Sequence, residues 1–271
     1  MLTSVTLPTW LDKLIFQKMG AKFCRSNADM TVIDWDKADM LKYLGTYFPR
    51  SYAESYCIFK DYFAKEPSNW ENRSEVSVFD FGCGTGGEII GLIFSLAECF
   101  PKIKTIKIKG LDGNFCALRL LENIIQEISN KTDLRIDFKA SALKIDDIYD
   151  MTIINNVLRN KYDIIMSFKA ICEFVSKKQF EERNPYQYLP IVLKDRLNDN
   201  GILLLEDVTT YNNTLREWLP KMMDRGLNDS HCEIKYQNEG YNQCFLVTHS
   251  HRKDDKSKVA WRIIMKSLLS R

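Results

Sequence analysis

The sequence has few of the residues that build metal centres and disulfide frameworks. It has three histidines among 271 residues, and His249 and His251 are the two that would share a face of a strand. Its eight cysteines form no C-x-x-C pair, and none lies at zinc-finger spacing from a histidine. We therefore expect reduced, mostly buried thiols and no metal site.

The sequence also lacks a strong net charge and any long apolar run. Its 38 Lys and Arg residues and 36 Asp and Glu residues give a net charge of +2, which does not favour a nucleic-acid partner over others. No apolar run reaches the roughly 18 residues of a membrane helix. The first residues do not combine a basic stretch with an apolar one, as secretory signals do. These features predict a cytoplasmic protein with no membrane partner.

The N-terminal part of the chain differs from the rest. Residues 1–70 are predicted to be helical and to form a cap or lid. Asp36 directly precedes one helical pattern as a candidate N-cap, and Ser51 with Glu54 predicts a capping box for another. A polar, proline-interrupted stretch then separates this region from residues 71–271.

In residues 71–271, strand and helix patterns alternate. The strands are predicted at 76–81, 105–112, 134–140, 162–168 and 202–208. The intervening helices include one predicted to end at Gly201 and one interrupted or restarted at Pro220. Two final strands, 243–251 and 257–267, are joined by the polar tip 252–256 and predict a hairpin. The pattern indicates an α/β fold with five β-α units and a terminal antiparallel hairpin.

The stretch "FDFGCGTGGEI" is predicted to join the first of these strands to a helix. Gly82, Gly84 and Gly87 fit G-x-G-x-x-G, whereas Gly82, Gly84 and Gly86 fit G-x-G-x-G. Glycines let a backbone approach a ligand closely, and a helix N-terminus favours a negative group. The loop therefore suits either a pyrophosphate or the carboxylate of an amino-acid-like ligand. A P-loop is excluded because no G-K-[ST] follows.

Two acidic residues separate these ligands. Asp80, just before the glycines, would repel a pyrophosphate and attract an ammonium group such as that of S-adenosylmethionine. Asp112, at the end of the next predicted strand, is placed to accept hydrogen bonds from two ribose hydroxyls. NAD enzymes share the second feature, so an NAD-dependent oxidoreductase stays open, with Asp80 as its main obstacle.

These residues resemble motifs I and II of the class I S-adenosylmethionine-dependent methyltransferases. "VFDFGCGTGGEI" and "IKGLDGN" match the family pattern, and the resemblance covers about residues 75–265. It implies a Rossmann-like, seven-stranded mixed sheet with the terminal antiparallel hairpin as strands six and seven. It also implies S-adenosylmethionine as the cofactor. The cofactor-binding residues expected from the motifs and strand ends are Asp80, Gly82, Cys83, Gly84, Gly86, Asp112, Gly113, Asn114, Ser141, Ala142 and Ser167.

The sequence departs from the family pattern after the third strand. Many members carry an Asp there that meets the adenine amine, but this chain has Ser141 and Ala142. The adenine contact is therefore expected from the Ser141 hydroxyl or from a backbone group. Asp146 or Asp147 is an alternative, although a loop-capping role suits them better.

Candidate catalytic residues follow the fourth and fifth strands, because open α/β sheets bind ligands at the carboxyl ends of their strands. Glu173 is expected to accept a proton or to orient an amine, and Lys169 is the second candidate. Glu206 and Asp207 are expected at the same rim, with capping of the following "TTYNNT" segment as the structural alternative. The Asn/Asp-Pro-Pro-aromatic motif of amino-methylating enzymes is absent, which argues against DNA adenine methylation. The acceptor is expected to be a small molecule or an RNA.

A second reading is a methyltransferase-like module that binds a ligand or a partner without catalysis. The weak motif after the fourth strand motivates it. A fainter similarity to methyltransferase-like proteins of the mitochondrial small ribosomal subunit would imply a link to RNA or the ribosome. Arg50, Tyr52 and Ala53 partly match that layout, but the metal-binding cysteines of those proteins are missing.

Overall fold

The computed structural model describes residues 3–24, 36–145, 147, 149–174, 182–213 and 215–266. The chain forms two compact units. The first comprises Met1–Glu75, Cys83–Leu143 and Cys244–Ser257, and the second comprises Val76–Gly82, Lys144–Gln243 and Lys258–Arg271. Each unit therefore combines segments that are far apart in the sequence.

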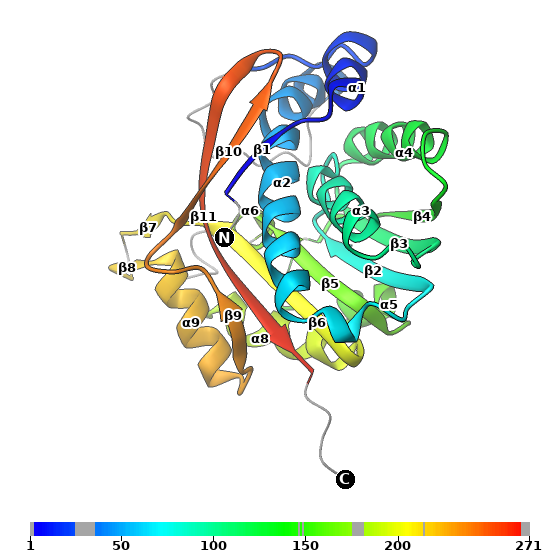
Figure 1. The fold of residues 1–271 in the computed structure, drawn as a ribbon. Helices are drawn as coiled ribbons and strands as arrows, with labels where there is room; N and C mark the ends of the chain where they lie inside the picture. The colour runs from blue at the N-terminus through cyan, green and yellow to red at the C-terminus, as the bar shows by residue number, and fades with distance from the viewer. Residues whose placement is uncertain are drawn as a thin grey trace. The chain divides into compact units, whose positions relative to one another are not determined.

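Strands and helices alternate along most of the chain (Figure 1). The strands are β1 (Ser4–Thr6), β2 (Glu75–Phe81), β3 (Thr105–Asp112), β4 (Arg135–Ala142), β5 (Tyr162–Phe168), β6 (Leu197–Val208), β7 (Tyr211–Asn212), β8 (Glu217–Trp218), β9 (Ile234–Gln237), β10 (Gln243–His249) and β11 (Arg252–Met265). The helices are α1 (Thr9–Asp12), the π-helix η1 (Lys13–Lys18), α2 (Lys37–Lys65), the 3-10 helix η2 (Pro67–Asn69), α3 (Gly87–Cys99), α4 (Phe115–Ser129), α5 (Met151–Val157), α6 (Ile171–Phe174), α8 (Pro185–Asp195) and α9 (Leu219–Asp229).

The sheet confirms the predicted mixed α/β fold. Its hydrogen-bonded order is β1-β10-β11-β6-β5-β2-β3-β4, with β9 paired to β11, and β7 pairs with β8 separately. In the second unit β2, β5 and β6 are parallel, while β11 runs antiparallel to β6. In the first unit β3 and β4 are parallel. Compared with the seven strands that the resemblance implied, this sheet of nine has two further short strands, β1 and β9.

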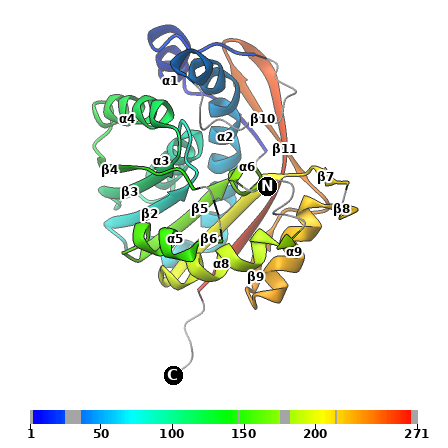
Figure 2. The ribbon, with the colours of Figure 1, turned by 180° about the vertical axis from the view of Figure 1, so that it is seen from behind.

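The strand β5 is the buried centre of the second unit. Every residue of Tyr162–Phe168 is buried, as expected for a parallel strand covered on both faces. Helices α8 and α9 pack against each other and against β6 (Figure 2). Because each large apolar side chain contributes about 1.5–3 kcal/mol when buried, this layer fixes the ends of β5 and β6 firmly.

In the first unit the long helix α2 packs directly against α3 (Figure 1). Gly87 and Gly91 lie one turn apart on α3. An added Cβ would lie 2.4 Å from the Phe48 carbonyl oxygen at Gly87 and 2.5 Å from the Tyr52 carbonyl oxygen at Gly91. The two helix backbones approach this closely because neither glycine has a side chain. Gly87, the third glycine of the G-x-G-x-x-G reading, therefore serves helix packing.

Helix α2 is continuous, so the helix start predicted at Ser51 is wrong. The helix runs through Pro49, and both Ser51 and Glu54 are buried within it. A proline inside a helix costs about 3 kcal/mol or more, which normally ends the helix. The close packing of α2 on α3 offsets this cost. The predicted cap at Asp36 is confirmed, since its carboxylate accepts a hydrogen bond from the Asp39 backbone N–H at 2.9 Å.

Two further boundaries differ from the predictions. The helix expected to end at Gly201 ends at Asp195, and Gly201 lies inside β6 because strand pairing begins at Leu197. The polar residues 252–256 belong to β11 instead of forming the hairpin tip, which lies between β10 and β11. The helix predicted to be interrupted or restarted at Pro220 first begins there: Pro220 lies in the first turn of α9, and Glu217–Trp218 before it form the strand β8 instead of a helix.

The N-terminal residues are not wholly helical, because Ser4–Thr6 pair in parallel with β10. The Asp12 carboxylate accepts hydrogen bonds from the backbone N–H and the hydroxyl of Ser250, at 2.9 and 3.0 Å. These contacts hold the chain start against the tip of β10 within the first unit. Among the helices that the structure describes, none is both long and apolar enough to cross a membrane.

Candidate functional site

The glycine loop that enters α3 has a backbone that requires glycine. Gly84 and Gly86 have φ angles of 46° and 77°, in the left-handed region that other residues rarely adopt. A Cβ at Gly86 would lie 2.2 Å from Cδ1 of Leu121, and one at Gly84 would lie 3.4 Å from Oη of Tyr43. The φ angles and these contacts require glycine at both positions, with or without a ligand. Because glycine has no side chain, the loop backbone stays uncovered at Gly84 and Gly86.

Backbone hydrogen bonds anchor this loop. The Cys83 N–H donates to the carbonyl of Leu111 at 3.0 Å, and the Gly86 N–H donates to the carbonyl of Cys83 at 2.7 Å. The loop is thereby tied to the end of β3 and leads directly into α3. The N-terminus of this 13-residue helix carries a partial positive charge that attracts an anion such as a carboxylate.

The Asp112 carboxylate is the polar centre of the loop. One oxygen accepts the Gly84 N–H at 2.7 Å, and the other accepts the Asn114 N–H at 2.7 Å. Burial raises the pKa of this carboxyl, and the two backbone hydrogen bonds act against that shift. Each carboxylate oxygen keeps a second acceptor position. Asp112 therefore both holds the loop in place and offers two acceptors to a ligand.

The other cofactor residues predicted in the first unit lie at the same edge of the sheet. Ser141 and Ala142 are the register partners of the last two residues of β3. Gly113 follows Asp112, and Asn114 caps α4 by accepting a backbone N–H at 2.9 Å. The first unit thus brings together the predicted residues Cys83, Gly84, Gly86, Asp112, Gly113, Asn114, Ser141 and Ala142.

One residue beside the loop was missed by the sequence analysis. Tyr43, on α2, has its ring and hydroxyl 3.4–3.8 Å from the position of an added Gly84 Cβ. Its ring lies 4.8 Å from that of Tyr47, and both side chains are half-buried. The helical spacing of these two tyrosines was visible in the sequence. Their position over a loop forty residues later was not, because it depends on the packing of α2 on α3.

The second unit holds the predicted residues from β2 and β5. Asp80 on β2 is the register partner of Met166 on β5, and Ser167 is the next residue of β5. Both Asp80 and Ser167 are fully buried. Within the part of the chain that the structure describes, the Ser167 hydroxyl makes no hydrogen bond. A buried hydroxyl without a partner is costly and uncommon, which marks this strand end as a place for a ligand. Gly82 follows Asp80 with φ 79°.

The two predicted catalytic residues follow β5. Lys169 has φ 53°, a strained conformation for a lysine, and its N–H donates to the carbonyl of Glu206 at 2.9 Å. Glu173 lies half-buried in the short helix α6, with its N–H donating to the carbonyl of Ala170 at 3.0 Å. Strained residues cluster at active sites, so the geometry of Lys169 agrees with a functional strand end.

Asp207 has a different place from either of the two expected. Its carboxylate accepts the Cys172 N–H at 3.1 Å and the Tyr186 hydroxyl at 2.6 Å, rather than capping the segment after β6. Burial raises the pKa of the Asp207 carboxyl and raises the pKa of the Cys172 thiol well above its usual range. Asp207 is fully buried, so its carboxylate stabilises the turn after β5 instead of facing the edge of the sheet where a ligand would bind.

The remaining candidates are placed outside this site. Asp147 accepts the Tyr149 N–H at 2.9 Å, which is the loop-capping role, and Asp146 lies outside the described residues. His249 stacks on Phe16 with ring centroids 5.1 Å apart, and its Nε2 lies 3.5 Å from Asp255. Within the described residues, no group of three or more His, Cys, Asp or Glu side chains is arranged to hold a metal.

Neither protein-family models nor curated proteins compared with the sequence give a match. Solved structures do match. Magnesium protoporphyrin IX methyltransferase from Synechocystis, solved with bound S-adenosylmethionine, is 12% identical; the alignment covers 95% of this chain and 90% of that chain, with a TM-score of 0.50. This similarity confirms the class I methyltransferase fold.

Two other matches have lower TM-scores. TehB from Haemophilus influenzae is 19% identical, covering 77% of this chain and 67% of that chain, with a TM-score of 0.43. Precorrin-6y C5,15-methyltransferase from Geobacter metallireducens is 11% identical, covering 76% of this chain and 88% of that chain, with a TM-score of 0.42.

Proposed function

We propose that this chain binds S-adenosylmethionine at the glycine loop and transfers its methyl group to a small-molecule or RNA acceptor. The observation that carries the proposal is the Asp112 carboxylate, which holds the loop through Gly84 and Asn114 and keeps acceptor positions for two further donors. A ribose presents two adjacent hydroxyl donors, which suit that carboxylate.

The residues of the first unit fit the cofactor's parts. Asp112 is proposed to bind the ribose hydroxyls, and the bare backbone of Cys83 to Gly86 is proposed to approach the amino-acid portion. Ser141 and Ala142, in register with the end of β3, are proposed to line the adenine. Tyr43 lies over the loop, which supports a lid role for residues 1–70.

The residues of the second unit supply the remaining proposed contacts. The buried Asp80 carboxylate suits an ammonium group, and the Ser167 hydroxyl suits a further polar contact. The cofactor supplies a methyl group already activated on a sulfonium. The protein's task is therefore to align the acceptor, to exclude water and to receive a proton. We assign the last role to Glu173 and the orienting role to Lys169.

A second candidate is a binding module without catalysis, and one observation favours it. Asp207, a buried carboxylate at the end of β6, accepts hydrogen bonds from the Cys172 N–H, the Tyr186 hydroxyl and the Val208 N–H. Asp207 is therefore not available to receive a proton, so the proposed catalysis depends on Glu173 alone. Methyl transfer from labelled S-adenosylmethionine, measured in the wild type and in Glu173→Gln, separates the two functions. Activity that is lost in the variant while cofactor affinity is kept favours catalysis over a binding module.

Calorimetric titration with S-adenosylmethionine and S-adenosylhomocysteine tests the cofactor assignment. We expect wild-type binding and about a 100-fold loss in Asp112→Ala, because two charge-assisted hydrogen bonds are removed. Asp137→Ala is the matched control, since Asp137 lies on the neighbouring strand β4, where its carboxylate pairs with Arg135. This control is expected to bind like the wild type.

The same titration tests the alternatives. Wild-type protein that binds NADH but not S-adenosylmethionine would replace the proposal with a dinucleotide function. Equal affinity in Asp112→Ala and Asp137→Ala would remove Asp112 from the site. Circular dichroism of each variant shows whether the loss of binding follows from unfolding.

A further inference from the structure

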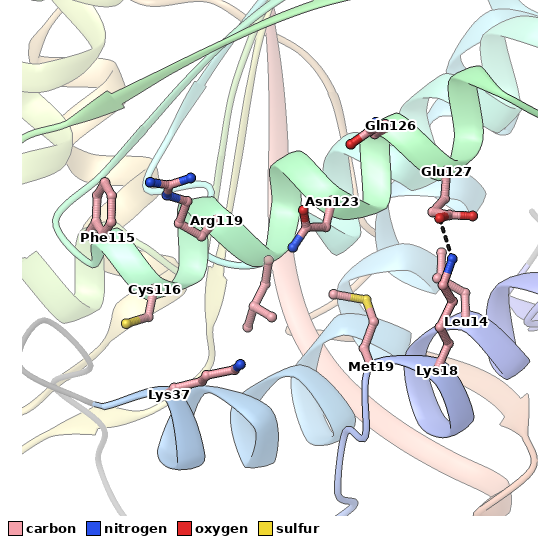
Figure 3. Close-up of a pocket in the computed structure, with 11 residues that line it drawn as sticks. Leu14, Lys18, Met19, Lys37, Phe115, Cys116, Arg119, Asn123, Gln126 and Glu127 are labelled. Carbon is pink, nitrogen blue, oxygen red and sulfur yellow. Dashed lines mark hydrogen bonds and ion pairs between the residues drawn. The ribbon is translucent and has the colours of Figure 1, made fainter.

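A cavity in the first unit is lined by residues other than those of the glycine loop. It has a volume of about 570 Å³ and lies between α4, the π-helix η1 and the start of α2 (Figure 3). None of its lining residues belongs to the loop or to the candidate residues described above. Its volume is within the range of roughly 300–1,000 Å³ that small-molecule sites occupy.

The lining of this cavity is positively charged. Lys18, Lys37 and Arg119 contribute three cations against the single carboxylate of Glu127, which pairs with Lys18. Figure 3 shows that ion pair at one end of the cavity, with Arg119 and Lys37 toward the other. Among the described residues, no carboxylate forms an ion pair with Lys37 or Arg119. Two cations are therefore left for an anion.

The acids nearest to Lys37 in the chain have other tasks. The Asp36 carboxylate caps α2, and Asp39 pairs with Lys42 at 3.0 Å. The positive charge at this end of the cavity is therefore not cancelled by an ion pair within α2. A guanidinium such as that of Arg119 binds a carboxylate or a phosphate through two parallel hydrogen bonds.

A flat apolar surface accompanies the charge. The Phe115 side chain, on the first turn of α4, is 58% exposed, so its ring is accessible to a ligand. The Arg119 guanidinium lies 4.9 Å from the centre of its ring. Leu14, Met19 and Leu120 also line the cavity, so its wall combines cationic and apolar side chains.

The wall opposite α4 is formed by an uncommon element. Lys13–Lys18 is a π-helix of six residues, and its Leu14 and Lys18 line the cavity together with Met19, which directly follows it. Such helices are rare and occur frequently at functional sites, because the wider turn changes the direction of its side chains. This observation is independent of the charges and points to the same cavity.

We propose that this cavity binds a flat organic anion, that is, an aromatic acid whose carboxylate or phosphate meets Arg119 and Lys37 and whose ring lies against Phe115. The proposal goes beyond the methyl-transfer function and does not depend on it, because the two sites share no residue. It assigns the cavity as a second ligand site, for an effector that is not the methyl acceptor.

Titration with a matched pair of probes tests the proposal. The first is 2-naphthoate, an aromatic carboxylate, and the second is 2-naphthamide, which has the same ring without the charge. We expect naphthoate to bind at least about tenfold more tightly than naphthamide. Arg119→Gln and Lys37→Gln are each expected to weaken naphthoate about tenfold and to leave naphthamide unchanged. Both residues are exposed, so neither substitution threatens the fold.

Lys13→Gln is the matched control, since Lys13 lies on the same π-helix but does not line the cavity. It is expected to bind naphthoate like the wild type. Cys116, which lines the cavity, reports the location: naphthoate is expected to slow its alkylation by iodoacetamide, measured by peptide mass spectrometry. Absence of naphthoate binding, equal affinity for both probes, or no protection of Cys116 would each overturn the assignment. None of these outcomes alters the S-adenosylmethionine titration.

Discussion

At the scale of single residues, the contrast between Asp112 and Asp207 is informative. Both carboxylates are buried, and burial raises the pKa of each. Asp112 accepts the backbone N–H groups of Gly84, in the glycine loop, and of Asn114, and each of its oxygens keeps an acceptor position for a ligand. Asp207 receives the Tyr186 hydroxyl at 2.6 Å as well as backbone N–H groups. The first is therefore suited to binding, and the second to holding the turn after β5.

Tyr186→Phe tests the structural role of Asp207. The change removes a hydrogen bond to a buried carboxylate, and we expect the free energy of unfolding to fall by about 2 kcal/mol. Urea unfolding measures it. Tyr188→Phe, on the same helix α8, is the control, because the Tyr188 side chain is 39% exposed and a surface change of this kind is worth about 0.5 kcal/mol or less. Equal losses in the two variants would contradict the assignment.

The same variant has a defined pH dependence. Folding raises the pKa of Asp207, so the wild type loses stability as pH rises from the usual carboxyl value through the folded one. The Tyr186 hydroxyl acts to lower that pKa, so its removal raises the folded value further. The penalty of Tyr186→Phe is therefore expected to be full above both folded pKa values and to shrink as pH falls. A penalty that is constant with pH would show that Asp207 is not ionised in the native protein.

At the scale of helices and strands, the close packing of α2 on α3 depends on two glycines. Gly91→Ala would place a Cβ 2.5 Å from the Tyr52 carbonyl oxygen and 2.8 Å from the Tyr56 nitrogen, both backbone atoms. We expect a loss of about 2 kcal/mol in the free energy of unfolding, despite the better helix propensity of alanine. Ala97→Gly, at an exposed position of α3, is the matched comparison and should lose about 1 kcal/mol from propensity alone. A stabilising Gly91→Ala would show that the helices are further apart.

This packing also explains which elements the sequence predicted well. The buried strands β2, β3 and β5 have strong apolar patterns, and their predicted positions agree with the structure within one residue, whereas β6 begins at Leu197 instead of at residue 202. Strands of two to four residues such as β1, β7 and β9 have too little pattern to be recognised. The capping box at Ser51 and Glu54 predicted a new helix start inside α2, but the contact of this helix with α3 overrides the local preference.

The same distinction holds for the candidate site. The glycine loop and Asp112 were predictable because their spacing is local and their backbone demands are specific. Tyr43 was not, since α2 brings it to the loop from a distant part of the sequence. Asp207 was assigned to a rim because alternation along a strand does not reveal which buried partner a carboxylate meets.

At the scale of the whole chain, one buried ion pair joins sequence positions that are far apart. Arg50, on α2, donates to both oxygens of Asp255, on β11, at 2.8 to 3.0 Å. The Asp255 side chain is fully buried, and its carboxyl pKa is lowered. Burial, the largest single influence, acts to raise that pKa, but the nearby His249 ring and the hydrogen bonds from Arg50 outweigh it. This pair closes a loop of about 200 residues, so it forms only when the first unit is assembled.

Arg50→Gln tests how strongly this pair holds the first unit. Removing the guanidinium leaves a buried carboxylate without its main partner, so we expect a loss of about 3 kcal/mol at neutral pH. Arg252→Gln is the control, because Arg252 lies 3.7 Å from the same carboxylate without an aligned pair of hydrogen bonds, and a loss of about 0.5 kcal/mol is expected.

Because folding lowers the Asp255 pKa, the stabilising contribution of the Asp255 carboxylate is present above the unfolded pKa and is lost as pH falls through the folded one. Arg50→Gln should therefore approach the wild type in acid, and a loss that persists at low pH would assign Arg50 a packing role instead of an electrostatic one.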